Sequence, residues 1–284
     1  MKMIEMDLSE KKELNQMKVM EQLIERVARD LVNSEYVIAL TGAGISTESG
    51  IPDYRGPEGI WTKNPEAERR AYQGWQRFLT DPKVWWEERL TSRRPGLFRG
   101  RERAMPNPGH YALVELEKLG ILKCVITQNV DALHEKAGSK NLLEYHGSGI
   151  KLRCVSCNLR FSRDEFDLEK LLLENQLPPR CPKCQGVIKS DGVGFGEPIP
   201  SDVANQSLEE ARKCDLMLIC GTSAVVYPFA NLPRIAKRRG AVTIIEVNAD
   251  PTPLTKEGVS DYIIQGKTGK ILPRIVEEVK RIRK

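Results

Sequence analysis

The chain has 284 residues, 40% of them hydrophobic, and its 44 basic and 39 acidic side chains leave a net charge of +5. These values suit one large α/β domain, or such a domain with a smaller lobe, and they give only faint support for nucleic-acid binding. No stretch approaches the roughly 20 apolar residues of a membrane helix. The charged N-terminal residues 1–18 lack the core of a signal peptide. We therefore expect a cytoplasmic protein with no membrane partner.

Helix-like and strand-like patterns alternate along the chain. Residues 17–31 have helical spacing and lead into a buried strand at 36–40, whereas residues 1 to about 12 are expected to be a frayed extension. Further strand-like runs lie at 121–126, 142–145, 216–220 and 242–247. Helical patterns lie at 109–119, 203–213, 229–239 and 270–284. This alternation predicts an α/β fold with a doubly wound parallel sheet.

Two segments interrupt that alternation. Residues 55–108 carry all four tryptophans and six prolines, and residues 150–190 carry four cysteines. We expect both to project from the sheet and to form a smaller lobe beside a ligand cleft. The predicted division is a Rossmann-like domain (20–54, 109–149 and 191–284), a helical part with mobile loops (55–108), a cysteine module (150–190) and an N-terminal extension (1–19).

A glycine turn, Gly42-Ala43-Gly44, directly follows the predicted strand 36–40. Glycine lets the backbone approach an anion closely, and the N–H groups at a helix start favour a pyrophosphate there. A dinucleotide is therefore the first expectation, although Thr47 stands where the usual fingerprint has a third glycine. The turn alone fits a plain strand-to-helix connection equally well.

Two Cys-x-x-Cys pairs form the strongest local signal. Twenty-three residues separate them, and their ligands are Cys154, Cys157, Cys181 and Cys184. Four thiolates leave no coordination position for water or substrate, so we expect one structural Zn²⁺ ion. A zinc ribbon can also bind nucleic acid, which keeps a non-enzymatic reading open. The other three cysteines, Cys124, Cys214 and Cys220, lie in or beside strand-like runs and are expected to be small buried hydrophobes.

The chain has three histidines, which narrows the search for a general base. His110 and His134 lie in helical patterns, where packing or capping is expected. His146 instead follows the short run 142–145 and precedes the cysteine module at the edge of the expected cleft. It is a catalytic candidate, with an ordinary polar residue at a strand end as the alternative.

Polar residues follow several of the predicted strands. Thr127-Gln128-Asn129-Val130-Asp131 offers two carboxamides and a carboxylate at a strand end, which suits recognition of a carboxamide such as that of nicotinamide. A turn capped by Asp131 is the simpler reading. Gly221-Thr222-Ser223 and Asn248 follow two other strands and are placed for phosphate and ribose hydroxyls.

Together these motifs resemble the sirtuins, the NAD-dependent protein deacylases, from about residue 20 to the C-terminus. The motifs that carry the resemblance are Gly42-Ala43-Gly44-Ile45-Ser46, Ile51-Pro52-Asp53-Tyr54-Arg55, Thr127-Gln128-Asn129-Val130-Asp131, His146-Gly147, the two cysteine pairs, Phe195-Gly196-Glu197, Gly221-Thr222-Ser223 and Val247-Asn248. The family fold is a Rossmann-like domain with a small lobe made of a zinc module and a helical part.

The resemblance implies that NAD is consumed as a co-substrate. It places His146 as the general base for a ribose hydroxyl and Asn129 beside it in the catalytic set, with Asn129 and Asp131 holding the nicotinamide carboxamide. The NAD-binding residues it implies are Gly42, Ala43, Gly44, Ser46, Asp53, Tyr54, Arg55, Gln128, Asn129, Val130, Asp131, Gly221, Thr222, Ser223, Asn248 and Lys267. The peptide-binding residues it implies, by strand pairing, are Val193, Phe195, Gly196, Glu197, Val225 and Val226.

Three positions depart from the family pattern. Tyr54 replaces a phenylalanine common in relatives, and 192–194 is glycine-rich where relatives often carry bulky residues, which bears on peptide affinity. Residues 82–94 lack the Tyr-x-x-Arg pair that binds succinyl groups, so acidic acyl groups are less expected.

The leading hypothesis is an NAD-dependent protein-lysine deacetylase that releases nicotinamide and O-acetyl-ADP-ribose. Its expected partners are acetylated protein lysines, with basic, chromatin-type proteins among them. Alternatives are deacylation of longer acyl chains, mono-ADP-ribosylation of protein and, more remotely, a zinc-ribbon nucleic-acid binder.

Overall fold

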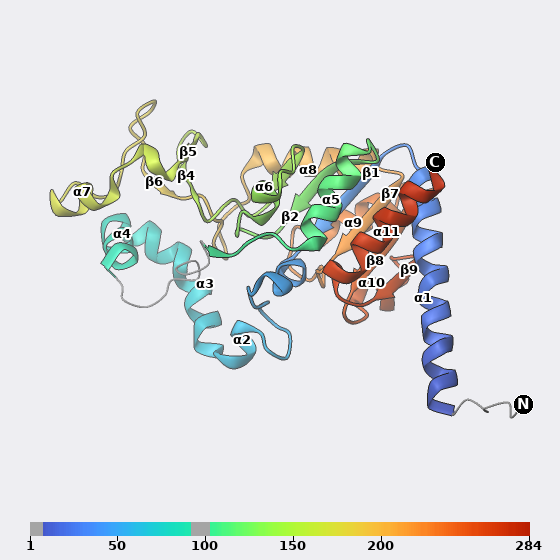
Figure 1. Cartoon of the computed structure of the whole chain (residues 1–284). Helices are drawn as coiled ribbons and strands as arrows, with labels where there is room; N and C mark the ends of the chain where they lie inside the picture. The colour runs from blue at the N-terminus through green and yellow to red at the C-terminus, as the bar shows by residue number, and fades with distance from the viewer. Residues whose placement is uncertain (1–7, 92–102) are drawn as a thin grey trace, which may run out of the picture.

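The computed structural model describes residues 8–91 and 103–284, and a six-stranded parallel sheet forms its centre (Figure 1). Its strands, in spatial order, are β3 (Leu142–Glu144), β2 (Leu122–Thr127), β1 (Val37–Thr41), β7 (Leu216–Cys220), β8 (Thr243–Asn248) and β9 (Tyr262–Gln265). Every neighbouring pair is parallel. The predicted α/β class with a doubly wound sheet is therefore confirmed.

Helices cover both faces of this sheet. Alternate β1 side chains point to opposite faces, so Val37 and Ala39 lie in one apolar core while Ile38 and Leu40 lie in the other. The first core is closed by α1 (Leu8–Asn33), α5 (Pro108–Lys118) and α11 (Thr268–Ile282). The second is closed by α8 (Ser201–Lys213), α9 (Asn231–Lys237) and α10 (Pro253–Lys256).

The strand order creates a crevice at one edge of the sheet. The chain builds outward from β1 through β2 to β3, and then restarts on the other side of β1 with β7. The connections therefore diverge between β1 and β7, the point at which ligands bind in open α/β sheets, beyond the carboxyl ends of the strands. We call this side of the sheet the carboxyl edge.

A second, three-stranded antiparallel sheet carries the cysteines. It consists of β5 (Arg160–Ser162), β4 (Lys151–Cys154) and β6 (Ile188–Ser190), with a short 3₁₀ turn, η3 (Arg163–Glu165), and α7 (Leu168–Leu173) nearby. Trp86 enters its core beside Cys154 and Cys181 and donates its indole N–H to the Ile188 carbonyl at 2.9 Å. The helical and cysteine segments therefore share one apolar core.

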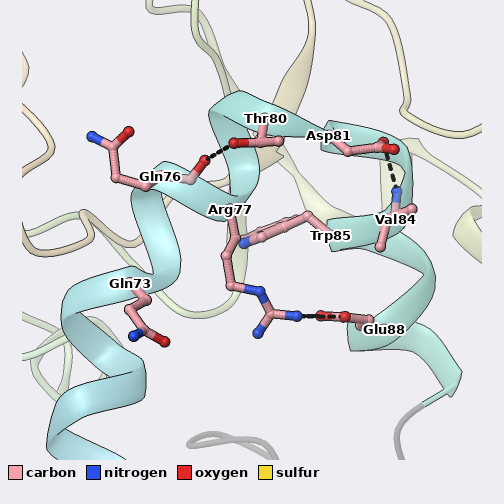
Figure 2. Close-up of a pocket in the computed structure, with 8 residues that line it drawn as sticks. All are labelled: Gln73, Gln76, Arg77, Thr80, Asp81, Val84, Trp85 and Glu88. Atoms are coloured by element: carbon pink, nitrogen blue, oxygen red, sulfur yellow. Dashed lines mark hydrogen bonds and ion pairs between the residues drawn. The ribbon is translucent and has the colours of Figure 1, made fainter.

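The helical part contains α2 (Ile60–Lys63), α3 (Pro65–Thr80) and α4 (Pro82–Thr91). Figure 1 shows these helices with the small sheet at the end of the molecule away from α1. A pocket between α3 and α4 is bordered by the Arg77–Glu88 ion pair and by Asp81, which accepts the Val84 N–H at 3.0 Å (Figure 2). This pocket shares no residue with the predicted site.

Several local features differ from the sequence expectation. Helix α1 begins at Leu8, so part of the segment expected to be frayed is helical. The turn after β1 continues as a 3₁₀ helix, η1 (Ala43–Ser49), which ends at Gly50 with φ +80°. Residues 1–7 and 92–102 lie outside the described residues, so the predicted boundaries of the extension and of the helical part stay predictions. In the described ranges, no helix is both long and apolar enough to cross a membrane.

Candidate functional site

Two glycine turns interlock at the start of the crevice between β1 and β7. The Gly44 N–H donates to the Gly221 carbonyl at 2.8 Å, and a Cβ atom on Gly44 would lie 2.7 Å from that oxygen. Gly221 has φ +62°, a conformation that glycine adopts without steric cost. Glycine is thus required here by close backbone contact between two strand ends.

The predicted nicotinamide-binding residues gather directly behind this turn. Asn129 Nδ2 donates to the Gly42 carbonyl at 2.9 Å and to Ser46 Oγ at 3.1 Å. Ser46 Oγ in turn donates to Asp131 Oδ2 at 2.7 Å. Asp131 also accepts the Leu133 N–H at 2.9 Å, so the simpler capping role is present as well. The structure therefore joins the glycine-turn motif (42–46) and the motif at 127–131 in one hydrogen-bonded cluster.

A second cluster continues along the carboxyl edge toward β8. Gln128 Nε2 donates to Thr222 Oγ1 at 2.7 Å, and Asn248 Nδ2 lies 3.3 Å from the Thr222 carbonyl. Ser223 is exposed beside them. Lys267 is also exposed and directly precedes α11, next to Gly266, whose N–H donates to the Asn248 carbonyl at 2.9 Å. Polar groups of this cluster thus follow β2, β7, β8 and β9 at one edge of the sheet.

His146 contacts the backbone of Gln128, which belongs to the second cluster. Its Nδ1 is 3.2 Å from the Gln128 carbonyl oxygen. A carbonyl can only accept, so this contact fits an imidazole with its proton on Nδ1 and with Nε2 as the basic nitrogen. Burial lowers the pKa of His146, although the ring remains partly exposed, and its neutral form is favoured at neutral pH.

The other two histidines have structural surroundings, as predicted. His110 Nδ1 accepts the Asn107 N–H at 3.3 Å in a capping box at the start of α5. His134 Nε2 lies 2.9 Å from Thr41 Oγ1. Both rings are buried, and burial lowers the pKa of each, that of His110 to about 4. Neither is available as a base at the crevice.

The segment after η1 folds back on itself and packs on aromatic residues of the small lobe. Asp53 Oδ1 accepts the Gly56 N–H at 2.8 Å, and the Arg55 guanidinium lies 4.5 Å from the Trp61 ring centroid. The Trp61 ring is 4.8 Å from that of Tyr54 and 5.5 Å from that of Phe195. The predicted NAD loop and the predicted peptide-binding segment are therefore in contact through Trp61.

One of the two peptide-binding segments lies directly against His146. The Val193 N–H donates to the His146 carbonyl at 2.8 Å, and Glu197 accepts the Gly194 N–H, also at 2.8 Å. Gly196 and Val225 are exposed, whereas Val226 is half-buried. The second segment approaches through Phe229, whose ring centroid is 6.3 Å from that of His146.

The four predicted metal ligands form one group. Their sulfur atoms all lie within 4.8 Å of one another, with Cys154 and Cys184 at 3.5 Å and Cys157 and Cys181 at 3.7 Å. Asn158 and Gln185 follow the two pairs, each with φ +60°, so the pairs form matching turns. Such a thiolate set suits a tetrahedral ion. Cys124, Cys214 and Cys220 are buried elsewhere in the second and first cores, as predicted.

Comparison with protein families matches residues 42–228, which contain both glycine turns, His146 and all four clustered cysteines, to the Sir2 family. The chain belongs to the Sir2 family. Members of the family are similar to this Sir2 protein over nearly its whole length.

Two archaeal enzymes and one solved structure illustrate that similarity. The NAD-dependent protein deacylase of Pyrococcus furiosus is 42% identical over 92% of this chain and 100% of its own length. The NAD-dependent protein deacetylase of Saccharolobus solfataricus is 43% identical, with coverages of 91% and 98%. A crystal structure of a Sir2 homologue with NAD has a TM-score of 0.72, 40% identity and coverages of 92% and 95%.

Several residues that shape the site of this Sir2 protein have no specific role that could be assigned from the sequence. Thr41 and Thr127 share a buried hydroxyl contact of 2.8 Å behind Asn129, whose N–H donates to Thr127 Oγ1 at 3.0 Å. Trp61 was noted only as one of four clustered tryptophans, and that clustering was the available signal. Asp191, which is fully buried, gave no signal, because its partners are distant in sequence.

Proposed function

We propose that this Sir2 protein is an NAD-dependent protein-lysine deacetylase that produces nicotinamide and O-acetyl-ADP-ribose. The observation that carries the proposal is that His146 Nδ1 contacts the carbonyl of Gln128, the residue directly before Asn129, and that Asn129 bonds to Ser46, which bonds to Asp131, beside the Gly42–Gly44 turn. These groups converge at the crevice between β1 and β7, where a parallel sheet binds its ligands. The archaeal relatives named above act on protein acyl groups with NAD, which supports the same activity here.

The residues at the crevice fit the parts of NAD. Asn129 and Asp131 offer a donor and an acceptor for the nicotinamide carboxamide, with Ser46 fixing both side chains. Gln128 is placed for a ribose hydroxyl. The backbone of Ala43 and Gly44, with Thr222, Ser223 and Asn248, suits the phosphates and the second ribose. Lys267 adds an exposed positive charge at the same edge.

The chemistry follows from the leaving group that NAD supplies. The nicotinamide ring is positively charged while bound to the ribose and departs as neutral nicotinamide with the bonding electron pair, so the positive character passes to the ribose carbon, which the acyl oxygen of the substrate lysine attacks. The protein's part is to align the two reactants and exclude water. His146 accepts the proton of a ribose hydroxyl at Nε2, and its hydrogen bond to the Gln128 carbonyl keeps the second nitrogen protonated. Asp53, Tyr54 and Arg55 close over the nucleotide with Val130 behind it.

The acylated peptide is proposed to bind as an extended strand between two segments. One segment contains Val193, Phe195, Gly196 and Glu197, and the other contains Val225 and Val226. The bond between Val193 N–H and the His146 carbonyl supports this placement, because it holds the first segment against the catalytic residue. Backbone pairing gives affinity without demanding one peptide sequence.

The cysteine cluster is proposed to hold one structural Zn²⁺ ion. Its four thiolates satisfy a tetrahedral ion completely, and Cys154 and Cys181 are buried in the small lobe core. The ion therefore stabilises the lobe and takes no part in acyl transfer. The expected cytoplasmic location and basic, chromatin-type substrates stay predictions.

A panel of peptides carrying acetyl, longer-chain and succinyl lysine, assayed with NAD by mass spectrometry, tests the proposal. Acetyl removal coupled to O-acetyl-ADP-ribose formation supports it. Preference for longer chains would favour the deacylase alternative, consistent with the name of the Pyrococcus enzyme. Nicotinamide release without peptide, or ADP-ribose attached to protein, would contradict it. His146→Ala should lose turnover and retain its metal.

A further inference from the structure

Two buried carboxylates flank His146. Glu144 lies two residues before it, at the end of β3. Ser148 lies two residues after it and donates its backbone N–H to Asp191 Oδ2 at 2.7 Å. Asp191 is fully buried and Glu144 is 6% exposed. A buried charge is strongly unfavourable unless it is paired, so each of these carboxylates needs a cation beside it.

Those cations all come from the small sheet. Arg160 Nη2, on β5, lies 2.6 Å from Glu144 Oε2 and 2.5 Å from Asp191 Oδ2, so one guanidinium bridges both carboxylates. On β4, Arg153 Nε lies 2.6 Å from Asp191 Oδ1, and Lys151 Nζ lies 3.1 Å from Glu144 Oε2. Charged groups therefore join the small sheet to the chain on either side of His146.

The backbone around His146 is also in contact with the segment that contains Asp191. Gly147 has φ +72°, and a Cβ atom there would lie 2.2 Å from the Asp191 carbonyl oxygen. The Asp191 N–H donates to the Lys151 carbonyl at 2.9 Å, and Val193 donates to the His146 carbonyl at 2.8 Å. The chain at 191–193 thus runs directly alongside 146–148.

We propose that Arg160 and Asp191 are positioning residues that hold the His146 imidazole in its catalytic place from the small sheet. Arg160 acts through its ion pair with Glu144, and Asp191 acts through the hydrogen bond that it accepts from the Ser148 N–H. The inference deepens the proposed function, since it takes His146 as the general base. It also gives the small sheet a role in the reaction beyond stability, because Arg160 of β5 pairs with both carboxylates beside His146.

Nuclear magnetic resonance titration of His146 in Arg160→Gln and Asp191→Asn tests the proposal directly. Burial lowers the pKa of His110 to about 4 and that of His134 well below the ordinary value, so the titration of His146 can be told apart from theirs. If positioning is lost, the ring becomes more hydrated, and its pKa rises toward 6.5 in both variants. If only charge matters, removing the cation raises the pKa and removing the anion lowers it. A lowered or unchanged pKa in Asp191→Asn would overturn the proposal.

Kinetics and a matched control complete the test. Both variants should lose about 10²-fold in kcat, as expected for a misplaced catalytic group, with little change in KM for NAD. Asp215→Asn is the control, because Asp215 accepts two backbone N–H groups, of Glu35 and Tyr36, at the opposite edge of the sheet. An equal loss of kcat in this control would overturn a specific role for Asp191.

Hydrogen exchange gives a second readout that does not depend on activity. The Ser148 and Val193 amides should exchange slowly in the unaltered protein and faster in Arg160→Gln, even if Asp191→Asn does not fold. Unchanged exchange of these amides would count against the proposal. If the unaltered protein fails to cleave NAD, the proposed function fails, whereas the His146 titration and the exchange data still decide the positioning role.

Discussion

Ser46 Oγ donates a 2.7 Å hydrogen bond to Asp131 Oδ2, and the two residues lie 85 positions apart in the chain. The same hydroxyl accepts from Asn129 Nδ2 at 3.1 Å. One serine on the turn after β1 therefore orients both side chains proposed to hold the nicotinamide carboxamide, which come from the end of β2. This contact makes the motifs at 42–46 and 127–131 a single site.

Replacing Ser46 by alanine should weaken NAD use without unfolding the protein. The change leaves Asp131 and Asn129 each short of one partner, which typically costs about 1–3 kcal/mol at a buried site. We expect kcat/KM for NAD to fall by about 10- to 100-fold. Thr47→Ala is the matched control, because the Thr47 hydroxyl is exposed and bonds only to the Gly44 carbonyl among the contacts described. Equal losses in both variants would argue against a special role for Ser46.

Deacetylation should depend on pH through His146. The base must be neutral to accept a proton, so activity is lost as pH falls through its pKa. Burial lowers that pKa, so the acid limb of kcat/KM should lie below the ordinary value of about 6.5. Nicotinamide release measured from pH 5 to 9 checks this. An acid limb centred above pH 7 would show that another group controls the reaction.

Two glycine substitutions should have opposite effects. In Gly44→Ala the new Cβ would lie 2.7 Å from the Gly221 carbonyl oxygen, so the two turns must separate. We expect a loss of about 1–3 kcal/mol in unfolding free energy and no detectable NAD binding. Gly74 lies inside α3 with open space at its Cβ, so Gly74→Ala should stabilise by about 0.5–1 kcal/mol. Denaturant unfolding measures the stability of each variant, and titration with NAD measures its binding. Unimpaired NAD binding by Gly44→Ala would contradict the prediction that the two turns must stay in contact.

The sequence was most informative where the signal is local. The apolar run predicted at 216–220 coincides with β7, and the run at 121–126 differs from β2 by one residue at each end. A buried strand depends on its own apolar side chains, so its limits can be predicted from them. The cysteine spacing was informative for the same reason, because two short turns place all four thiols.

Longer-range features could not be predicted in that way. Strand β9 (Tyr262–Gln265) has an apolar run of only three residues, Tyr262-Ile263-Ile264, of which Ile264 alone is buried, so its sequence signal is short. The 3₁₀ geometry of η1 depends on contact with the Gly221 turn. The ion pairs of Arg160 with Glu144 and Asp191 join residues 16 and 31 positions apart, and charge alone does not identify such partners.

Removing the proposed zinc ion should loosen the small lobe and hydrate Trp86. This side chain is 1% exposed and packs with Cys154 and Cys181. Chelation or Cys184→Ser should therefore red-shift the tryptophan emission and lower the melting temperature. Cys124→Ser is the control, since Cys124 is buried in the second core and does not belong to the cluster. This variant should still bind one metal ion per chain. If the red shift persists in Trp86→Phe, another tryptophan produces it, and the predicted hydration of Trp86 is wrong.

His110→Gln should reduce the sensitivity of the fold to acid. Burial lowers the pKa of His110 to about 4, so between about pH 6.5 and pH 4 the unfolded chain binds a proton that the folded chain does not. In that window this histidine makes the unfolding free energy fall by about 1.4 kcal/mol per pH unit as pH decreases. Glutamine cannot titrate, yet it can still accept the Asn107 N–H, because glutamine is a usual residue at this position of a capping box.

Urea unfolding of the two proteins at several pH values checks this expectation. The variant should show a shallower decline in stability from pH 6.5 to pH 4.5, whereas above pH 7.5 the two slopes should agree because His110 is neutral in both states. Parallel curves throughout the acid range would mean that the buried ring at the start of α5 gains its proton without loss of packing. The expected difference instead makes His110 an acid-sensitive part of the core that takes no proton in the reaction.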